Sequence, residues 1–453
     1  AESWEGQVEQ ATSMFKTVFS VMENNQKYVN YLADTLVEIG DSVPEHIESC
    51  KITVKNPARD LTLFDVHSLP DDLFVQPGEK TPNRIGFSKY ASYINTVAEQ
   101  KYGRPLVVAM SADLADSTNV SGFAKEYGGT KSKGFYDKEN NPNSPLMPQG
   151  ITEFTNAGMM AGLATVNFSE DTYKEFNGFY GAMSTYGSFS YLKYGPLRLF
   201  SQMAQDSDLK VGKVIWVAGH SGPETAEDSR THFGIFAPGV TQLFPEGQII
   251  NLHPWEHNEV APCLAAALST DVALIVLHLT RPPVTIPDRE ALGMASYLAA
   301  ARGAYIIKDY DHNVDKKGVV IIRGTSSTNS LVEILPRLTE EGPNVKIVAA
   351  VSWELFQRQL EDYQYSVISG QEWQDAMVIT NGALRLMHKW MANRIVEEYS
   401  LSPDFDNRWR TGGSLEQIIK ESKLDPQSVW DGIMHFTNDR EKRLTRLRSE
   451  IPT

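Results

Sequence analysis

The sequence has few cysteines, no long apolar run and no excess of basic residues. Its only two cysteines, Cys50 and Cys263, lie far apart and form no metal-binding motif. This cysteine usage is typical of a reducing compartment, and we expect a cytoplasmic location. No stretch reaches about 18 consecutive apolar residues, so no membrane span is expected. The formal net charge of −15 argues against nonspecific binding to nucleic acid or to an anionic membrane.

Length and composition predict a folded chain with several domains. Hydrophobic residues make up 41% of the sequence and aromatic residues 10%, which is enough for full-size cores. A length of 453 residues suggests two or three domains. The first residues have neither a basic region nor an apolar core, so no signal peptide is expected. They also lack an initiator Met, which leaves processing and a longer parent chain as alternatives.

The alternation of helical patterns with short apolar runs predicts an α/β fold. We expect two doubly wound parallel-sheet domains, because strands separated by helices form parallel sheets covered on both faces. Residues 1–82 are interpreted as a helical N-terminal extension followed by a linker on the surface. Residues 83–300 form the first predicted domain and residues 301–453 the second.

Local sequence patterns also predict single helices and strands. A short helix is expected at 330–335, stopped by Pro336, and one C-terminal helix is expected at 428–448. Strands in the two domains are expected at 105–110, 214–218, 248–252, 272–279, 319–322 and 345–351.

Several segments near the predicted strand ends carry side chains suited to ligand binding. Met110–Val120 follows a strand, and Glu153 opens an apolar, small-residue helix, where the helix dipole favours a carboxylate. Tyr173, Phe176 and Phe179 are spaced to share one face of a helix. Each pattern also has an ordinary structural explanation: a capped turn, a helix-terminal charge and a core stripe.

The loop Gly219–His232 is the most informative segment. Asp228 follows His220 by eight residues, and His232 follows four residues later. A zinc site is one interpretation, but no cysteine or further histidine has suitable spacing. We therefore predict no metal site built from this chain's residues.

Taken together, these segments resemble the transketolase family of thiamine-diphosphate-dependent enzymes over about residues 83–400. The resemblance implies that Glu153 hydrogen-bonds N1′ of the cofactor's aminopyrimidine ring and so supports its activation. It also implies further cofactor contacts, with three aromatic rings stacking on the pyrimidine. These contacts would come from Asp113, Leu114, Tyr173, Phe176 and Phe179.

For the substrate, the resemblance implies that His220, Asp228 and His232 bind ketose hydroxyls and assist proton transfers. It also implies a site for a sugar phosphate, in which Ser117 and Arg281 match family residues. Lys89 stands where the family usually has an arginine, and lysine cannot form the bidentate contact of a guanidinium.

Two departures from the family pattern affect the prediction. Ser229-Arg230 replaces the family's Gly-Pro beside His232. The chain also lacks the Gly-Asp-Gly motif that binds diphosphate and Mg2+; Gly40-Asp41-Ser42 is the nearest approach. We therefore expect thiamine diphosphate and Mg2+ to be held mainly by a diphosphate-binding domain or subunit absent from this chain. That part is either a separate gene product or a removed N-terminal region, and the assembled enzyme is expected to homodimerise.

The predicted activity is ketol transfer from a ketose, expected to be phosphorylated, to an aldose. The alternative is a 2-oxoacid dehydrogenase E1 component or its β-type subunit, which would release CO2 from a 2-oxoacid. The His220, Asp228 and His232 layout favours ketol transfer, because sugar hydroxyls need several polar partners, whereas Ser229-Arg230 keeps the alternative open. A regulatory or scaffold subunit is a third interpretation, against which Glu153 counts.

Overall fold

The chain falls into two separate units, residues 1–52 and residues 53–453. The computed structural model describes residues 3–43, 55–112, 114–128, 134–219, 221–227, 229–410 and 412–450. The first unit contains α1 (Trp4–Asn24) and α2 (Gln26–Ser42), which confirms the predicted helical extension. No helix among the described residues is both long and apolar enough to cross a membrane.

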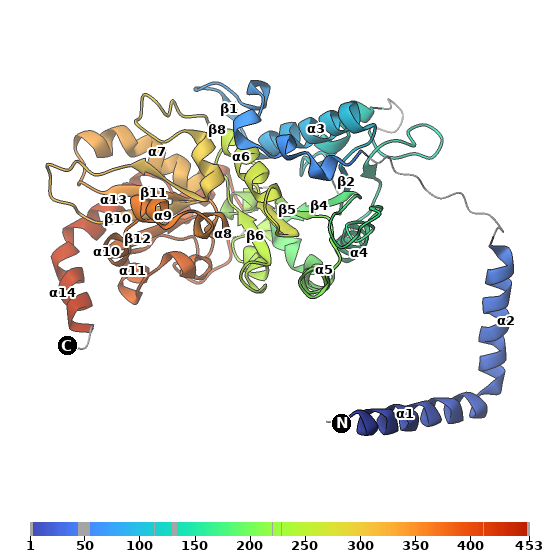
Figure 1. Cartoon of the computed structure of the whole chain (residues 1–453). Coiled ribbons are helices and arrows are strands. Elements are labelled where there is room, and N and C mark those ends of the chain that lie inside the picture. Colours follow the sequence, from blue (N-terminus) through green and yellow to red (C-terminus); the bar gives the residue numbers. More distant parts are fainter. Residues whose placement is uncertain are drawn as a thin grey trace. The chain divides into compact units, whose positions relative to one another are not determined.

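A six-stranded, fully parallel sheet forms the first half of the second unit (Figure 1). Its strand order is β3-β2-β4-β5-β7-β6. The strands are β2 (Val107–Ser111), β3 (Leu146–Met147), β4 (Tyr180–Tyr186), β5 (Val214–Gly219), β6 (Ile249–Leu252) and β7 (Leu274–His278). They are buried because helices cover both faces, as expected for parallel sheets. α3 (Asn83–Tyr102) and α6 (His257–Leu268) cover one face, and α4 (Glu153–Leu163) and α5 (Tyr194–Asp206) the other.

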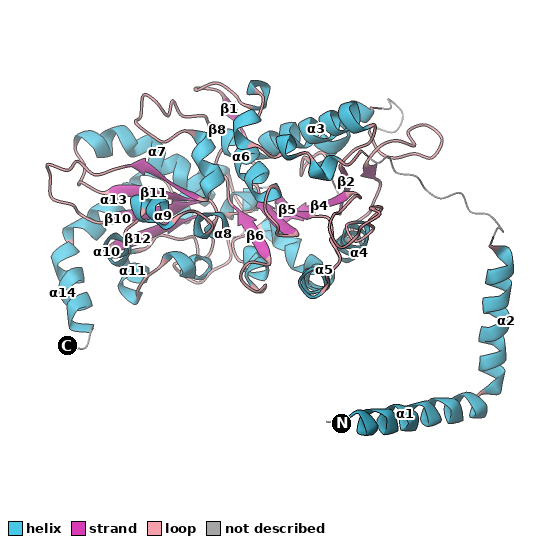
Figure 2. Cartoon of the chain, viewed as in Figure 1, coloured by secondary structure: helices cyan, strands magenta, loops and turns pink. Residues whose placement is uncertain are grey.

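A four-stranded sheet of order β12-β10-β11-β9 follows (Figure 2). Its strands are β9 (Ala304–Lys308), β10 (Val319–Arg323), β11 (Lys346–Ala350) and β12 (Ala376–Thr380). β9 runs antiparallel at the edge, so this sheet is mixed rather than wholly parallel as predicted. The helices are α7 (Thr325–Glu340), α8 (Trp353–Gln357), α9 (Glu361–Val367), α10 (Gly370–Gln374), α11 (Arg394–Tyr399), α12 (Leu415–Glu421), α13 (Pro426–Asn438) and α14 (Arg440–Glu450). β1 (Lys80–Thr81) and β8 (Val284–Thr285) form a separate antiparallel pair.

Three local predictions need correction. α7 continues through Pro336 to Glu340, because Leu335 and Leu338 are buried in the core and hold the helix despite the missing N–H. The predicted single C-terminal helix is two helices that meet at Asp439. The region 57–73 is not a surface linker but a series of short 3-10 turns that bury Leu63 in the main core.

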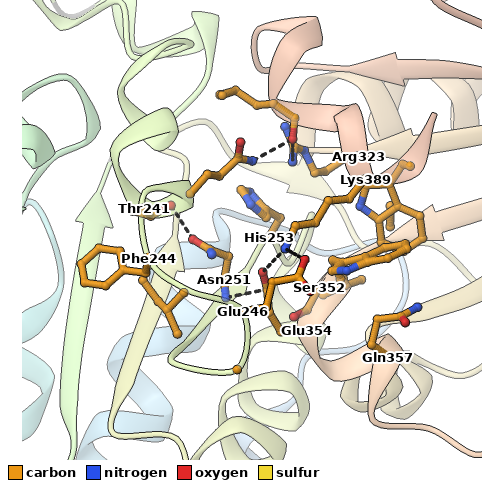
Figure 3. A pocket seen from close by; sticks show the side chains of 18 of the residues that line it. Thr241, Phe244, Glu246, Asn251, His253, Arg323, Ser352, Glu354, Gln357 and Lys389 are labelled. Carbon is orange, nitrogen blue, oxygen red and sulfur yellow. Dashed lines mark hydrogen bonds and ion pairs between the residues drawn. The ribbon is translucent and has the colours of Figure 1, made fainter. Parts of the chain in front are cut away.

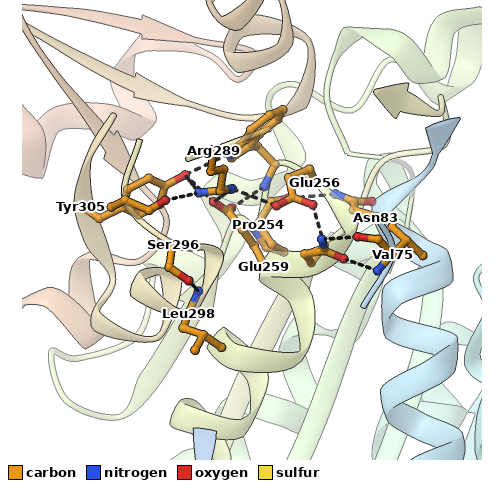
Figure 4. Close-up of polar contacts among 12 residues, drawn as sticks. Val75, Asn83, Pro254, Glu256, Glu259, Arg289, Ser296, Leu298 and Tyr305 are labelled. Carbon is orange, nitrogen blue, oxygen red and sulfur yellow. Dashed lines mark hydrogen bonds and ion pairs between the residues drawn. The ribbon is translucent and has the colours of Figure 1, made fainter. Parts of the chain in front are cut away.

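A buried ionic cluster joins the end of the first sheet to the second (Figure 4). Arg289 donates through one nitrogen to Glu256 Oε1 at 2.8 Å and to Glu259 Oε1 at 2.9 Å. The Tyr305 hydroxyl, on β9, donates to the same Glu259 carboxylate and accepts from Trp255 Nε1 at 3.0 Å. Burial raises the pKa of Glu256, and the neighbouring Glu259 adds to this rise while Arg289 opposes it.

Replacement of Arg289 should destabilise the protein strongly, because both buried carboxylates would lose their counter-charge. For Arg289→Met we expect the free energy of unfolding to fall by about 3–5 kcal/mol, measured by urea denaturation. Arg59→Met is the matched control, since Arg59 pairs with Glu175 at 2.6 Å but is 69% exposed. Its loss should stay below about 1 kcal/mol. Equal losses in the two variants would contradict the role assigned to the buried cluster.

Candidate functional site

A cavity of about 550 Å³ opens at the carboxyl ends of β2 and β4. This is the edge of a parallel sheet at which ligands bind. Three predicted site residues line it together: Leu114 from the loop after β2, Glu153 at the start of α4, and His232 from the loop after β5. The remaining walls come from Ser111, Ala112, Thr118, Ile151, Thr185, Tyr186, Phe189, Tyr191 and Leu192.

Glu153 is the buried charge of this cavity. Glu153 is only 6% exposed, and its Oε1 accepts a hydrogen bond from the Thr185 hydroxyl at 3.0 Å. Lys193, a second buried ionisable side chain, is not among the cavity-lining residues and donates to the carbonyls of Met183 at 3.2 Å and Val217 at 3.3 Å. Burial holds the pKa of Lys193 well below its usual range, while the Glu153 carboxylate opposes that shift. A carboxylate fixed in this way can accept a hydrogen bond from a protonated ring nitrogen that approaches from one defined direction.

The aromatic walls differ from those predicted. Residues 172–174 form a turn followed by irregular chain, so Tyr173, Phe176 and Phe179 do not share a helical face. None of the three lines the cavity. Tyr173 is 64% exposed, Phe176 stacks on Tyr180 with centroids 6.1 Å apart, and the Arg104 guanidinium lies 4.9 Å from the centre of the Phe179 ring.

Tyr186 and Phe189 line the cavity instead, together with Leu192 three residues further on. These residues have the same i, i+3, i+6 spacing, but they begin at the last residue of β4. The signal was therefore present in the sequence. It was missed because Tyr180–Tyr186, with Gly, Ser and Thr, is not an apolar run and was not recognised as a strand.

His232 packs directly against these rings. Its imidazole lies 4.6 Å from the Tyr186 ring and 5.7 Å from the Phe189 ring, centroid to centroid. Ser229 belongs to the Ser229-Arg230 pair that replaces the family's Gly-Pro. Its side chain accepts a hydrogen bond from the Thr231 N–H and so caps the short turn Arg230–His232. The other predicted residues of this motif, His220 and Asp228, lie outside the described residues, as does Asp113.

The cation beside Ser117 is Arg84 rather than Lys89. Arg84, in the first turn of α3, donates to the Ser117 carbonyl at 2.7 Å, and the Ser117 and Tyr186 hydroxyls are 3.4 Å apart. Lys89 donates instead to the Asp72 carbonyl at 2.9 Å, because it lies more than one turn further along the helix. Arg281 follows β7 at the same sheet edge but is not among the cavity-lining residues.

The second sheet holds the loop that carries His232. Glu224 of this loop is 2% exposed, and its Oε1 accepts from the Ser326 N–H at 3.0 Å, at the start of α7. The Asn381 amide donates to the same oxygen at 3.4 Å. Burial raises the pKa of Glu224, and the hydrogen bonds from Ser326 and Asn381 oppose this rise.

Within the described part of the chain, no group of three or more His, Cys, Asp or Glu side chains is arranged to hold a metal ion. The cavity therefore offers a carboxylate, an imidazole, hydroxyls and aromatic faces. These groups suit a flat, nitrogen-containing ring and a hydroxylated substrate.

Comparison with known proteins gives two family matches. Residues 91–285 match the transketolase pyrimidine-binding domain, and residues 303–399 match the transketolase-like C-terminal domain. Transketolase 7 of Craterostigma plantagineum is 29% identical over 167 residues, which is 36% of this chain and 23% of that protein. A probable transketolase of Schizosaccharomyces pombe is 27% identical over 300 residues, covering 63% of this chain and 37% of that protein. The matches thus span well under half the length of these relatives.

Solved transketolases share the fold. The Leishmania mexicana enzyme has a TM-score of 0.63 at 16% identity, covering 85% of this chain and 48% of that one. The Pichia stipitis enzyme, solved in complex with sedoheptulose 7-phosphate, has a TM-score of 0.59 at 17% identity, covering 96% of this chain and 54% of that one. The chain therefore belongs to the transketolase family, whose cofactors are thiamine diphosphate and a divalent metal ion, through the family's pyrimidine-binding and C-terminal domains.

Proposed function

We propose that this chain supplies the pyrimidine-binding and C-terminal part of an enzyme that transfers a ketol unit from a phosphorylated ketose to an aldose. The observation that carries the proposal is Glu153, a buried carboxylate held by Thr185 in a cavity walled by Tyr186 and Phe189. A buried carboxylate needs a partner, and a protonated ring nitrogen provides one.

The residues of the cavity fit the aminopyrimidine half of thiamine diphosphate. Glu153 would hold its ring nitrogen, and Tyr186 and Phe189 offer aromatic faces to the ring in place of the residues predicted from sequence. When bound, the cofactor supplies a nucleophilic carbon for cleavage of the bond between C2 and C3 of a ketose. The protein's contribution is to orient this group and to exclude water.

Substrate binding would use His232 of the cavity together with Arg84 and Ser117, whose hydroxyl lies 3.4 Å from that of Tyr186. His232, which lines the cavity, would accept the proton of the C3 hydroxyl at a ring nitrogen. Arg84 and the Ser117 hydroxyl would bind the sugar phosphate, because a guanidinium can form two parallel hydrogen bonds to phosphate oxygens. The complex of the Pichia stipitis enzyme with sedoheptulose 7-phosphate supports a sugar phosphate as substrate.

The diphosphate and its metal ion require residues from elsewhere. The sequence has no Gly-Asp-Gly motif, and the described residues form no metal-binding cluster. We infer that a further domain or subunit binds them and completes the enzyme. Activity is therefore measured with this chain in its assembled complex.

Glu153→Gln should lower turnover by about 10²–10⁴-fold, because the amide keeps the volume but cannot take part in proton transfer. Turnover is measured in the assembled complex with a phosphorylated ketose, and folding by circular dichroism. Glu170→Gln, at an exposed position, is the control and should retain full activity. Near-normal turnover of Glu153→Gln would exclude this residue as the cofactor's partner.

Arg84→Ala should raise KM for a phosphorylated ketose by about 10–100-fold, the range expected for lost hydrogen bonds to a charged group. The KM for the unphosphorylated ketose should change little, and so should kcat. Lys89→Ala is the matched control on the same helix and should leave both values nearly unchanged. If Lys89→Ala has the larger effect, the reassignment to Arg84 is wrong.

His232→Ala distinguishes ketol transfer from 2-oxoacid decarboxylation, because a 2-oxoacid has no C3 hydroxyl proton to remove. Cleavage of the ketose should fall by at least about tenfold. His312→Ala, at an exposed position, is the control. CO2 release from pyruvate by the wild-type complex, without ketose cleavage, would establish the dehydrogenase alternative instead.

A further inference from the structure

A second cavity, of about 340 Å³, lies between the two sheets and shares no lining residue with the Glu153 cavity (Figure 3). Asn251 on β6 and His253 just after it contribute from the first sheet. Arg323 at the end of β10, Ser352 after β11, and Lys389 contribute from the second. The proposed activity uses none of these residues.

Arg323 is the unusual group in this cavity. It is 6% exposed, and its guanidinium donates through NH1 to the Leu386 carbonyl at 3.3 Å. No ion pair joins it to any carboxylate among the described residues, and Glu354 acts on it only from a greater distance. Burial lowers the pKa of Arg323 to about 10, which still leaves it charged at neutral pH. A buried, unpaired cation is costly, so an anion that enters the cavity would be stabilised there.

The neighbouring polar groups leave room for such an anion. Lys389 pairs with Glu246 at 3.1 Å, but Glu246 is largely exposed, and Lys389 reaches Glu354 only at 4.0 Å. Glu354 is already bound by the Asn251 N–H at 3.1 Å. His253 stacks on His278 with centroids 4.2 Å apart, and burial holds its pKa well below the usual range. It therefore contributes a neutral donor rather than a third charge.

Aromatic side chains also line the cavity. Trp353 and Trp390 both line the cavity, with ring centroids 5.0 Å apart in an edge-to-face arrangement, and Phe244 lines it from the first sheet. A ligand that suits both kinds of lining has a charged oxygen group and a flat apolar body. A cavity of this size suits a small molecule.

We propose that this cavity binds a small organic anion, with its carboxylate or phosphate group against Arg323 and its apolar body between Trp353, Trp390 and Phe244. Because both sheets contribute walls, the bound anion would also strengthen the contact between them. Carboxylate and phosphate ligands of this kind share one feature, a single anionic oxygen group attached to an aromatic or apolar body.

Calorimetry and thermal unfolding of the whole purified chain test this proposal with benzoate and phenyl phosphate as probes. At least one of them should bind saturably and raise Tm, since a ligand that binds only the folded state stabilises it. Benzoate and phenyl phosphate distinguish a carboxylate from a phosphate preference. Benzyl alcohol, which lacks the charge, should bind at least about tenfold more weakly. Binding of neither anion, or equal binding of benzyl alcohol, would overturn the proposal.

Arg323→Met should weaken binding of the preferred anion by at least about tenfold, while Tm without ligand stays within about 3 °C, because an unpaired charge is removed. Lys389→Met provides a second variant in case Arg323→Met fails to fold, and should weaken binding severalfold. Arg358→Met is the matched control: Arg358 lines the same cavity but is 38% exposed and pairs with Asp271 at 3.5 Å. Unchanged affinity in both Arg323→Met and Lys389→Met would rule the site out.

The N-terminal unit carries an independent signal. From Trp4 onward, apolar residues recur at alternating spacings of four and three, which is the heptad pattern of a coiled coil. Neither α1 nor α2 contains a buried residue. The heptad core positions are Trp4, Val8, Ala11, Phe15, Val18, Met22, Asn25, Val29, Leu32, Leu36, Ile39 and Val43.

Asn25 is the single polar residue at these core positions. Asn25 falls at a d position, three residues after Met22, and lies between α1 and α2. A lone asparagine in a heptad core favours the register in which it can pair with its own copy, at a cost in stability. Met14, Val21 and Phe19 lie at flanking heptad positions and widen the apolar stripe beyond a minimal seam. The register continues from α1 into α2, although the two helices are separate in the single chain. We propose that residues 4–43 assemble with the same segment of a second copy of this chain.

Cysteine crosslinking of the full chain tests this second proposal. Asn25→Cys should give a disulfide-linked dimer in high yield under mild oxidation, because position 25 lies in the core near the middle of the segment. Asn24→Cys, one residue away on the outer face, is the matched control and should crosslink at least about fivefold less. The wild-type chain gives the background from its own cysteines. Equal crosslinking at positions 24 and 25, or none at either, would overturn the proposal.

Discussion

Parallel pairing of β2 with β4 and of β4 with β5 places the loops that follow these three strands at one end of the sheet. Leu114 and His232, from the loops after β2 and β5, and Tyr186, the last residue of β4, thereby line one cavity. The start of α4 reaches the same edge and brings Glu153 against Thr185. A change in the register of β4 by one residue would turn Thr185 away from Glu153 and place its neighbours there instead. The chemistry of the site therefore depends on the hydrogen bonding of one strand.

That strand also marks the limit of what the sequence predicts. Apolar runs such as Val214–Ala218 and Val319–Ile322 were recognised because burial on both faces requires apolar residues throughout. β4 is buried too, but small residues such as Gly181 let α4 approach closely, so its composition resembles a loop. Without β4, the predicted aromatic set begins at Tyr173, 13 residues before Tyr186, the tyrosine at the end of β4 that lines the cavity. Glu153, Leu114 and His232, which the family resemblance names, do line one cavity, because matching short motifs requires no knowledge of the strands between them.

The partners of charged side chains were less predictable than the strands, because they depend on which side chains contact each other in the folded chain. Arg84 and Lys89 are both basic residues on one helix, and sequence alone favoured Lys89. The structure separates them because the first turn of α3, not the second, approaches the Ser117 loop. Arg289 and Arg323 differ in the same way. Both are buried, yet Arg289 meets two carboxylates whereas Arg323 pairs with no carboxylate of the described chain.

The C-terminal domain contributes no side chain to the Glu153 cavity. Through Glu224, however, it contacts the loop that carries His232. By accepting the Ser326 N–H, this carboxylate ties the loop that carries His232 to the first turn of α7. A fragment that ended after the first sheet would lack α7 and α12, which contact the segment that contains Glu224. The loop would then lose the hydrogen bond and the packing that hold it, and the position of the His232 imidazole would no longer be fixed. Under the proposed function, truncation would thus separate ring binding, which needs the first domain, from sugar selection, which needs both.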